Sequence, residues 1–449
     1  MKVVKFGGTS LASADQIKKV CDIILSDPKR RLIVVSAPGK RFDDDIKVTD
    51  LLIDLGEKYY QTKKAEEEFK RVIDRFDEIV KGLGLGEETI NMVYEDLKGR
   101  LEGSYDSKEK FIDVMKAAGE DNNAKIIAQY LVSIGVDAIY INPKDAGMLL
   151  SEQCGNGRAL PEAYDNLKKL SERKEIMIFP GFFGCSKNGD IVTFSRGGSD
   201  ISGSILAAAV NAEVYENFTD VDSVFAADPK MVENPKPIPV FTYKEMRELA
   251  YSGFSVLHEE TFEPVYRKKI PVCIKNTNNP TAPGTLITPE RDSKGSTVIG
   301  IAGARGFCSI YVTKYMMNRE IGFGRKILSI IEDEGLSYEH TPSGIDDISI
   351  ILKQNQLDEE KERRVKERII KELEVDDISI ERDLALVMVV GEGMRETVGI
   401  AGRATTALAK AGVNIVMINQ GSSEVSMMFG VQQDDNEKAV RALYDEFFK

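Results

Sequence analysis

Two segments in the last third of the chain repeat one another, and this duplication restricts the possible folds more than any other feature. Residues 334–336 resemble 411–413, and the apolar run 347–351 resembles 424–428. The offset is 77 residues both from Gly335 to Gly412 and from Ser349 to Ser426. Such a long period indicates a duplicated domain, because the repeats of solenoid proteins span about 20–50 residues.

Each copy of the repeat has the pattern of a strand, a helix, two strands and a second helix. The first copy adds a final strand at 378–380, whereas the second copy ends on a helix at 439–448 and lacks that strand. An apolar run at 297–302 precedes the first copy. We infer that this run completes the second copy, so that the first copy is nested inside the second. The predicted ranges are 297–304 for the completing strand, 305–383 for the first copy and 384–449 for the second.

The first part of the chain alternates short apolar runs with helical patterns. Strands are predicted at 3–6, 32–35, 137–141 and 176–179, and helices around 47–60 and 120–134. This alternation predicts an α/β domain whose mainly parallel sheet is covered on both faces. A stretch rich in proline, threonine and glycine at 280–296 marks its end, so the first domain is predicted at 1–290.

Three local patterns refine this first domain. Ser13 is a predicted N-cap, and Asn188-Gly189 predicts a hairpin turn. The charged stretch 59–98 has a helical pattern. We interpret that stretch as a solvated helical face, with an inserted lid as the alternative.

Composition excludes several classes of protein. The net charge of −13 argues against a general binder of nucleic acid or of anionic membranes, which requires a basic surface. The five cysteines lie far apart and form no C-x-x-C pair, which argues against a zinc knuckle or a disulfide framework. The chain starts without a signal-peptide pattern, and no apolar run reaches the ~18 residues that span a bilayer. We therefore expect a cytoplasmic protein with reduced thiols.

Three polar constellations follow predicted strands. Lys5 stands before Gly7 and Gly8, whose backbone N–H groups favour an anion, although a tight turn is the preferred explanation of two glycines taken alone. Arg196 and Asp200 flank the glycines 197–198 at a predicted helix start, and a capped helix with a surface ion pair is the alternative. The acids in 217–222 suit a ribose hydroxyl or hydrated Mg²⁺, or simply a turn. The P-loop and dinucleotide-binding fingerprints are absent.

Taken together and in this order, the motifs 5–10, 196–200, 218–222 and 256–258 resemble the amino-acid kinase family and, within it, the aspartate kinases. The resemblance covers essentially the whole chain and implies a three-layer α/β kinase fold followed by two ferredoxin-like βαββαβ ACT domains, which sense amino acids. It also implies a phosphotransferase that uses ATP and Mg²⁺ to make 4-phospho-L-aspartate. That reaction opens the biosynthesis of lysine, threonine and methionine. The chain ends without a homoserine dehydrogenase half, so we expect the monofunctional type.

Site roles follow from the same resemblance. Lys5 would neutralise the transferring phosphoryl group, Gly7 and Gly8 would cradle it, and Asp200 would orient Lys5. Arg196 would clamp the α-carboxylate of aspartate and Glu120 would pair with its ammonium group. The acceptor pocket would be completed by Ser36, Thr49, Phe182, Gly197 and Ser199, and the nucleotide would be held by Lys5, Gly8, Thr219, Asp220, Phe225, Lys230, Ser255 and Val256. No residue is predicted as a direct metal ligand.

Several nucleotide positions depart from the family pattern. Ser255 stands where many members carry lysine, Lys230 replaces a frequent arginine, and Phe225 replaces a frequent tyrosine. The substrate itself needs no general base, because an aspartate carboxylate, with a pKa of about 3.9, is already ionised at neutral pH. His258 is accordingly interpreted as structural.

The first ACT copy carries the predicted effector site. The resemblance assigns it Met317, Arg319, Glu320, Phe323, Gly324, Ser337, Tyr338 and Glu339. A carboxylate such as Glu339 suits an ammonium-bearing effector, which favours lysine over threonine, and a simple subunit contact is the alternative. Pairing of ACT domains predicts a dimer or tetramer. Two other functions stay open, a glutamate 5-kinase type of phosphotransferase and a non-catalytic amino-acid sensor.

Overall fold

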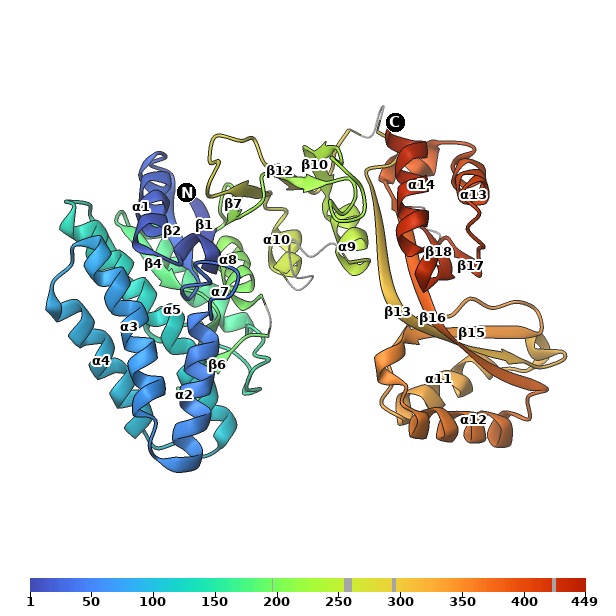
Figure 1. The fold of residues 1–449 in the computed structure, drawn as a ribbon, viewed down its shortest axis with the longest axis horizontal. Coiled ribbons are helices and arrows are strands. Elements are labelled where there is room, and N and C mark those ends of the chain that lie inside the picture. The colour runs from blue at the N-terminus through green and yellow to red at the C-terminus, as the bar shows by residue number, and fades with distance from the viewer. Residues whose placement is uncertain (196, 254–260, 293–295, 422–424) are drawn as a thin grey trace. The chain divides into compact units, whose positions relative to one another are not determined.

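The computed structural model describes all residues except 196, 254–260, 293–295 and 422–424 (Figure 1). The chain divides into two compact units. Unit 1 contains Met1–Val224, Ile238–Tyr243 and Ser255–Arg291, and unit 2 contains Phe225–Pro237, Lys244–Phe254 and Asp292–Lys449. Two short segments of the N-terminal 290 residues therefore belong to the unit that contains the duplicated tail.

Unit 1 is built on an eight-stranded sheet with the order β10-β12-β11-β7-β1-β2-β4-β3. The strands are β1 (Lys2–Phe6), β2 (Arg30–Val35), β3 (Ala138–Tyr140), β4 (Ile176–Pro180), β7 (Tyr215–Thr219), β10 (Val240–Thr242), β11 (Val272–Asn276) and β12 (Thr285–Thr288). All neighbours are parallel except β11 and β12. The predicted mainly parallel sheet is confirmed.

Helices cover both faces of this sheet. Alternate residues of a strand point to opposite sides, so a strand made of apolar residues presents apolar side chains on both faces. Val4, Phe6, Ile33 and Val35 pack into one core cluster with residues of α1 to α5. The other face of β1, β2 and β7 is covered by α8. The helices of unit 1 are α1 (Ala14–Leu25), α2 (Val48–Thr62), α3 (Glu66–Leu83), α4 (Glu87–Glu102), α5 (Lys108–Ser133), α6 (Pro143–Ala146), α7 (Pro161–Leu167), α8 (Gly198–Ala209) and α10 (Phe262–Lys268), with 3₁₀ turns η1 (Gly8–Leu11) and η2 (Lys168–Glu172).

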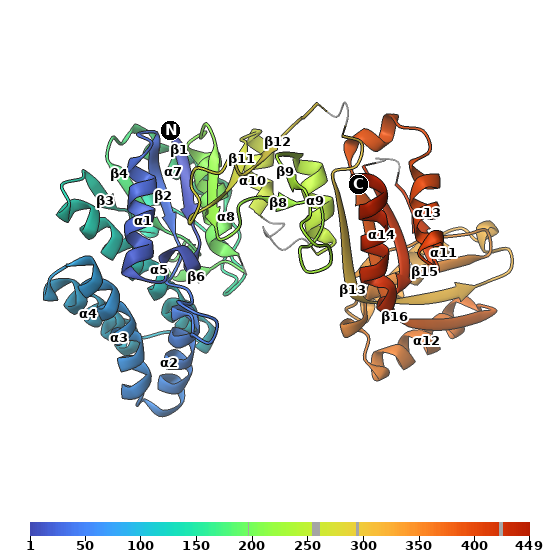
Figure 2. The same ribbon diagram turned by 45° about the horizontal axis from the view of Figure 1, so that its top comes forward.

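The charged segment 59–98 is helical, as predicted, and it belongs to the core of unit 1. Val72, Phe76 and Ile79 of α3 are buried in the same cluster as β1 and β2. Their spacing places them on one face of the helix, so the charged residues occupy the opposite face. Figures 1 and 2 show α2, α3 and α4 side by side. The alternative of an inserted lid is wrong, because α3 packs into the core.

Two local predictions are confirmed in unit 1. The Ser13 hydroxyl caps α1 by accepting a hydrogen bond from the Gln16 N–H at 3.4 Å. The hairpin consists of β5 (Phe183–Cys185) and β6 (Ile191–Thr193), with Gly189 at φ 85° in its turn. A positive φ of this kind favours glycine. Among the described residues, no helix is both long and apolar enough to cross a membrane.

Unit 2 contains a six-stranded antiparallel sheet with the order β14-β15-β13-β16-β18-β17. The strands are β13 (Gly300–Thr313), β14 (Tyr338–His340), β15 (Asp347–Lys353), β16 (Asp377–Val390), β17 (Met417–Asn419) and β18 (Ser426–Gln432). The helices are α11 (Phe323–Asp333), α12 (Glu359–Leu373), α13 (Ile400–Lys410) and α14 (Asn436–Phe448), with 3₁₀ turns η4 (Met317–Arg319), η5 (Gln354–Gln356), η6 (Glu392–Glu396) and η7 (Gln433–Asp435). Each copy of the repeat thus forms one lobe, with α11 and α12 in the first and α13 and α14 in the second.

Two long strands run through both lobes. Residues 300–305 of β13 pair with 385–390 of β16, and residues 309–313 pair with 377–381. The predicted boundaries near 305 and 384 therefore fall inside continuous strands. The register of β13 shifts between Arg305 and Phe307, where Gly306 has φ 86°. Such a bulge bends a strand without ending it.

The two short segments of unit 2 pack on the second lobe. They include parts of β8 (Val224–Phe225), β9 (Pro237–Ile238) and α9 (Tyr243–Tyr251). The Ile301 N–H donates to the Ala226 carbonyl at 2.7 Å, and the Ser426 hydroxyl donates to Glu248 Oε2 at 2.8 Å. Side-chain and backbone hydrogen bonds thus join these segments to β13 and β18.

Candidate active site

The loops that follow β1, β2, β4 and β7 meet at the carboxyl edge of the unit 1 sheet. Backbone hydrogen bonds continue the sheet into these loops, from Gly7 N–H to the Phe218 carbonyl at 3.1 Å and from Gly181 N–H to the Val35 carbonyl at 2.9 Å. In open α/β sheets, ligands bind outside this edge, where the strand order reverses direction. Most residues predicted for catalysis and substrate binding lie in these loops or at the adjacent helix starts.

Lys5 is a buried cation held by two partners from different elements. Its Nζ lies 2.6 Å from Asp200 Oδ1 in α8 and 3.5 Å from Asn217 Oδ1 in β7. The Asn217 amide donates in turn to Asp200 Oδ1 at 2.7 Å. Lys5 points toward α8 because Val4 and Phe6, on either side of it, point into the opposite core. This arrangement fixes a positive charge beside the glycine turn.

The turn after β1 is closely packed against the loop after β2. A Cβ atom on Gly8 would lie 3.0 Å from the Ala37 carbonyl oxygen, so little space remains for a side chain there. The Ser10 and Thr277 hydroxyl oxygens are 2.7 Å apart and join the turn to the segment after β11. Gly7 and Gly8 therefore have a defined backbone geometry. The Gly7 N–H is used by the Phe218 carbonyl, and the Gly8 N–H is the one that can face a ligand.

The start of α8 is packed against the loop after β4. A Cβ atom on Gly198 would lie 2.6 Å from the Phe182 ring, and one on Gly181 would lie 2.7 Å from Ser199 Cβ. Phe182 itself has φ 73°, a conformation that costs a non-glycine residue about 1–3 kcal/mol. Gly197, at φ 80°, is the N-cap. Phe182, Gly197 and Ser199 are thus brought together, and Arg196 lies outside the described residues.

Glu120 is a buried carboxylate on α5 beside the loop after β2. Burial raises its pKa to about 8, opposed by a hydrogen bond from the Ala37 backbone. Its Oε2 atom has no hydrogen-bond partner among the described residues. A buried, unpaired carboxylate is well suited to receive a cationic ligand group. Ser36 lies in the same loop, and Thr49 lies in the first turn of α2, next to Val48.

The predicted nucleotide residues are distributed over both units. Thr219 ends β7, and its hydroxyl donates to Asp220 Oδ1 at 3.2 Å. Phe225 and Lys230 belong to unit 2, where the Lys230 N–H donates to Asp228 Oδ1 at 2.8 Å. Ser255, Val256 and the neighbouring His258 lie outside the described residues.

A magnesium ion would have few direct ligands from the described part of the chain. No group of three or more His, Cys, Asp or Glu side chains is gathered there as a metal site. Asp220 and Asp222 follow β7, and Asp222 Oδ1 accepts a hydrogen bond from the Asn276 amide at 2.7 Å. Mg²⁺ commonly keeps several waters and takes only one or two carboxylates beside substrate phosphates, so this pair of acids fits it.

The predicted effector residues of unit 2 separate into buried and accessible sets. Met317 and Phe323 are buried in the core cluster of the first lobe. Glu320 forms ion pairs of 2.7 Å with Lys314 and with Lys326, whose hydrogen bonds lower the pKa of Glu320. Glu339 accepts a hydrogen bond from Tyr251 of α9. Arg319, Ser337 and Tyr338 are exposed and Gly324 is half-buried.

Sequence reasoning missed two polar residues of the site. Asn217 contacts both Lys5 and Asp200, and the signal was a polar residue within the buried strand Tyr215–Thr219. Asn123 donates from its side-chain amide to the Ser36 carbonyl at 2.7 Å. It follows Glu120 by three residues, which places it close to the same face of α5.

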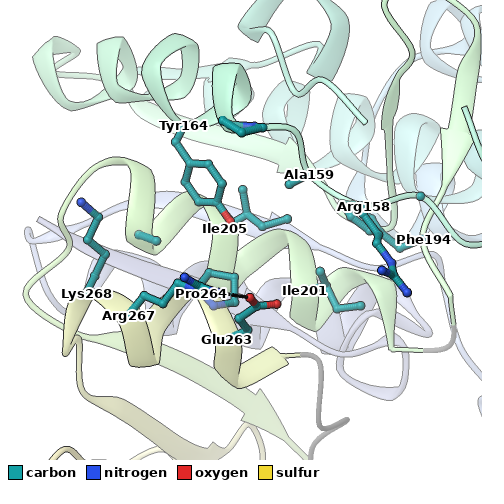
Figure 3. A pocket seen from close by; sticks show the side chains of 13 residues that line it. Arg158, Ala159, Tyr164, Phe194, Ile201, Ile205, Glu263, Pro264, Arg267 and Lys268 are labelled. Atoms are coloured by element: carbon teal, nitrogen blue, oxygen red, sulfur yellow. Dashed lines mark hydrogen bonds and ion pairs between the residues drawn. The ribbon is translucent and has the colours of Figure 1, made fainter. Parts of the chain in front are cut away.

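A separate hollow of about 810 Å³ opens on the other side of α8 (Figure 3). Ile201 and Ile205 line it, together with Tyr164, whereas the carboxylate of Asp200 faces Lys5. Glu263 and Arg267 pair with one another at its rim at 2.8 Å. None of the predicted site residues that the structure describes lines this hollow. It is therefore distinct from the candidate active site.

Both units of the chain are similar to domains of known proteins. Residues 1–276 match the model of the amino acid kinase family, and residues 387–447 match an ACT domain model. Aspartokinase 3 of Bacillus subtilis is 56% identical over 100% of this chain and 99% of that protein. The crystal structure of Clostridium acetobutylicum aspartate kinase covers 100% of both chains with 42% identity and a TM-score of 0.87. Escherichia coli aspartokinase III, solved with aspartate and ADP, shares the fold at 24% identity and a TM-score of 0.79.

A fixed cation beside a glycine turn, at the carboxyl edge of a mainly parallel sheet, defines a site of the phosphoryl-transfer class. The chain belongs to the amino acid kinase family and, within it, to the aspartate kinases. The enzyme transfers a phosphoryl group from ATP to the side-chain carboxylate of aspartate.

Proposed function

We propose that the buried Lys5–Asp200 pair is the centre of this phosphoryl transfer. The observation that carries the proposal is the 2.6 Å contact between the two side chains, with Asn217 bonded to both. Phosphoryl transfer demands little covalent work from a protein, so charge neutralisation and in-line placement account for most of the catalysis. Lys5 would neutralise the transferring group while the Gly7–Gly8 turn cradles it, with the Gly8 N–H as the backbone donor.

The acceptor pocket would hold aspartate by its two α-substituents. Glu120, buried and with one unpaired oxygen, would accept the ammonium group, and Arg196 would bind the α-carboxylate. Ser36, Thr49, Phe182, Gly197 and Ser199 would enclose the substrate. Because the β-carboxylate is already ionised at neutral pH, no side chain has to remove a proton from it.

The nucleotide end would use residues that follow β7. Thr219 and Asp220 would contact the nucleoside, and Phe225, Lys230, Ser255 and Val256 would complete the binding set together with Lys5 and Gly8. Mg²⁺ would be held near Asp220 and Asp222, where it would offset the negative charge of the phosphates. Lysine at position 230 would supply a point charge in place of the two-pronged contact of arginine.

The first lobe would bind a feedback inhibitor, with lysine preferred over threonine. The Escherichia coli enzyme has been solved with lysine and aspartate in its T state, and its fold is that of this chain. Arg319, Gly324, Ser337, Tyr338 and Glu339 would form the accessible part of the effector site, with Glu320 beside them. We further propose that homo-oligomers assemble through the ACT lobes as dimers or tetramers, and that the domain ranges are 1–290, 297–304, 305–383 and 384–449.

One assay tests acceptor and effector together. ADP formation is coupled to NADH oxidation with aspartate, glutamate or a nucleoside monophosphate as acceptor, and aspartate alone should support turnover. Lysine, threonine and methionine are then added singly and in pairs, and lysine should inhibit and raise the melting temperature. Turnover with glutamate but not with aspartate would contradict aspartate as the acceptor. Inhibition by threonine alone would contradict lysine as the effector.

A further inference from the structure

Arg75 is a buried arginine in the middle of α3, with 5% of its surface exposed. One of its nitrogens, Nη2, donates to the carbonyl oxygen of Ala12 at 3.3 Å and to that of Gly39 at 3.0 Å. Ala12 follows the glycine turn after β1, and Gly39 lies in the loop after β2. A single guanidinium group therefore joins the two loops that border Lys5.

The two loops also touch each other directly. The Gly39 N–H donates to the Gly8 carbonyl at 2.8 Å. A Cβ atom on Gly39 would lie 2.5 Å from the Gly8 carbonyl carbon and 2.7 Å from the Thr9 nitrogen, so no side chain fits at that position. The backbone of Gly8 is thus placed by its contact with Gly39, whose carbonyl is bound by Arg75.

Arg75 is not simply one member of a tight ion pair. Its Nη2 lies 3.6 Å from Asp45, a carboxylate that already accepts hydrogen bonds from the Arg41 side chain at 2.8 Å and backbone at 2.9 Å. Its Nε and Nη1 atoms have no hydrogen-bond partner among the described residues, and Nη1 lies 3.9 Å from Glu78 Oε2. Burying such a charge is costly, and an apolar side chain would fill the same space more favourably. The two carbonyl contacts are the feature that an apolar residue could not supply.

We propose that Arg75 is a positioning residue for phosphoryl transfer, which fixes the Gly7–Gly8 turn relative to Lys5 by binding the carbonyls of Ala12 and Gly39. This inference rests on the proposed function, in which that turn cradles the transferred group. Arg75 acts through the two loops and contacts no substrate. Displacing reacting groups by as little as about 1 Å lowers rates by roughly 10²-fold, so a loose turn would slow the chemical step.

The first test replaces Arg75 by lysine, which keeps the charge but supplies a compact ammonium group in place of the guanidinium fork. We expect kcat to fall roughly 10- to 100-fold while KM for aspartate changes little. Arg71→Lys is the matched control, because Arg71 is an exposed arginine one turn earlier on the same helix and should keep full activity. Circular dichroism and thermal melts report whether each variant is folded under the assay conditions.

A second variant disturbs the contact between the two loops without changing any residue of α3. Gly39→Ala places a methyl group against the Gly8 backbone and should also lower kcat with little change in KM. This variant decides the question if Arg75→Lys does not fold. Full kcat in either folded variant, or a loss of kcat that only follows the unfolded fraction, would overturn the inference. Absence of aspartate phosphorylation by the unmodified protein would instead refute the proposed function, and this inference with it.

Discussion

Two lysine–carboxylate pairs, one in each unit, have nearly the same length and very different surroundings. Lys5 Nζ lies 2.6 Å from Asp200, and these side chains are 9% and 17% exposed. Lys326 Nζ lies 2.7 Å from Glu320, and these side chains are 41% and 27% exposed. Water and salt screen the second pair much more than the first.

The two pairs differ in burial and hardly in contact distance. The first pair is enclosed between β1, β7 and α8 and has Asn217 as a third member, so its geometry is fixed before any substrate binds. Glu320 is shared between two lysines on the first lobe, so that removing one lysine leaves the other. A catalytic site benefits from the fixed arrangement, because the charge needs no reorganisation during the reaction.

The largest effect is expected from breaking the buried pair. Lys5→Met preserves much of the side-chain volume but removes the charge that we propose to neutralise the phosphoryl group. We expect kcat to fall by roughly 10²–10³-fold, the cost of removing one group that stabilises the transition state. The measurement is the coupled ADP assay with a thermal melt.

The double variant Lys5→Met/Asp200→Asn is the control for this prediction. It removes the unpaired buried carboxylate, so it should be more stable than Lys5→Met while remaining inactive. Activity close to that of the unmodified enzyme in either variant would contradict the assigned role of Lys5.

A smaller effect is expected from removing the third member of the buried pair. Asn217→Ala leaves Lys5 and Asp200 in place but deletes hydrogen bonds to both, and a hydrogen bond to a charged group contributes about 1.5–3 kcal/mol. Loss of about this free energy from the transition state would lower kcat roughly tenfold or more, and this is the decrease that we expect. Asn278→Ala, which changes an exposed asparagine of unit 1, is the control and should leave kcat unchanged. An unaltered kcat for Asn217→Ala would show that two members of the cluster suffice.

The acceptor end should depend on pH through Glu120, whose pKa burial raises to about 8. In the proposed site the ammonium group of aspartate would pair with the ionised carboxylate of Glu120, so KM for aspartate should fall as pH rises toward 8, by at most about tenfold per pH unit. Above pH 8 the dependence should level off. Steady-state kinetics across this range test it, and Glu120→Gln should bind aspartate weakly without the same pH dependence.

The raised pKa of Glu120 should also make the stability of the protein depend on pH. Its pKa lies above the ordinary value of 4.5, so the folded state binds more protons than the unfolded state between these two values. Its contribution to stability is therefore most favourable below about pH 4.5, decreases as pH rises, and is least favourable above about pH 8. Glu120→Gln should raise the melting temperature more at alkaline than at acidic pH, and the reverse order would contradict the raised pKa.

The smallest effect is expected from the exposed pair. Lys326→Gln removes one of two lysines that contact Glu320, and exposed ion pairs contribute little to stability. We expect the melting temperature to change by no more than about 1–2 °C and kcat without effector to remain unchanged. A destabilisation as large as that of Lys5→Met would contradict the expectation that the exposed pair contributes less to stability than the buried pair.

Much of the fold could be predicted from local patterns. Apolar runs at 3–6 and 32–35 identified neighbouring strands, and the offset of 77 residues identified two lobes with the same order of elements. The patterns did not show that β13 and β16 are continuous through both lobes, because a strand bent at a bulge looks like two short strands in sequence. They also did not place the apolar face of α3, which carries a strongly charged sequence, in the core.

The class of enzyme, the order of its motifs and the duplicated tail follow from the amino-acid sequence alone, since each motif is a short run of consecutive residues. Folding brings Asn217 to the Lys5–Asp200 pair and Arg75 to the carbonyls of Ala12 and Gly39. These contacts join residues that are 17 to 212 positions apart. Parallel strands and the helices packed on them bring such residues together, and no local pattern records which strand face or helix face meets which.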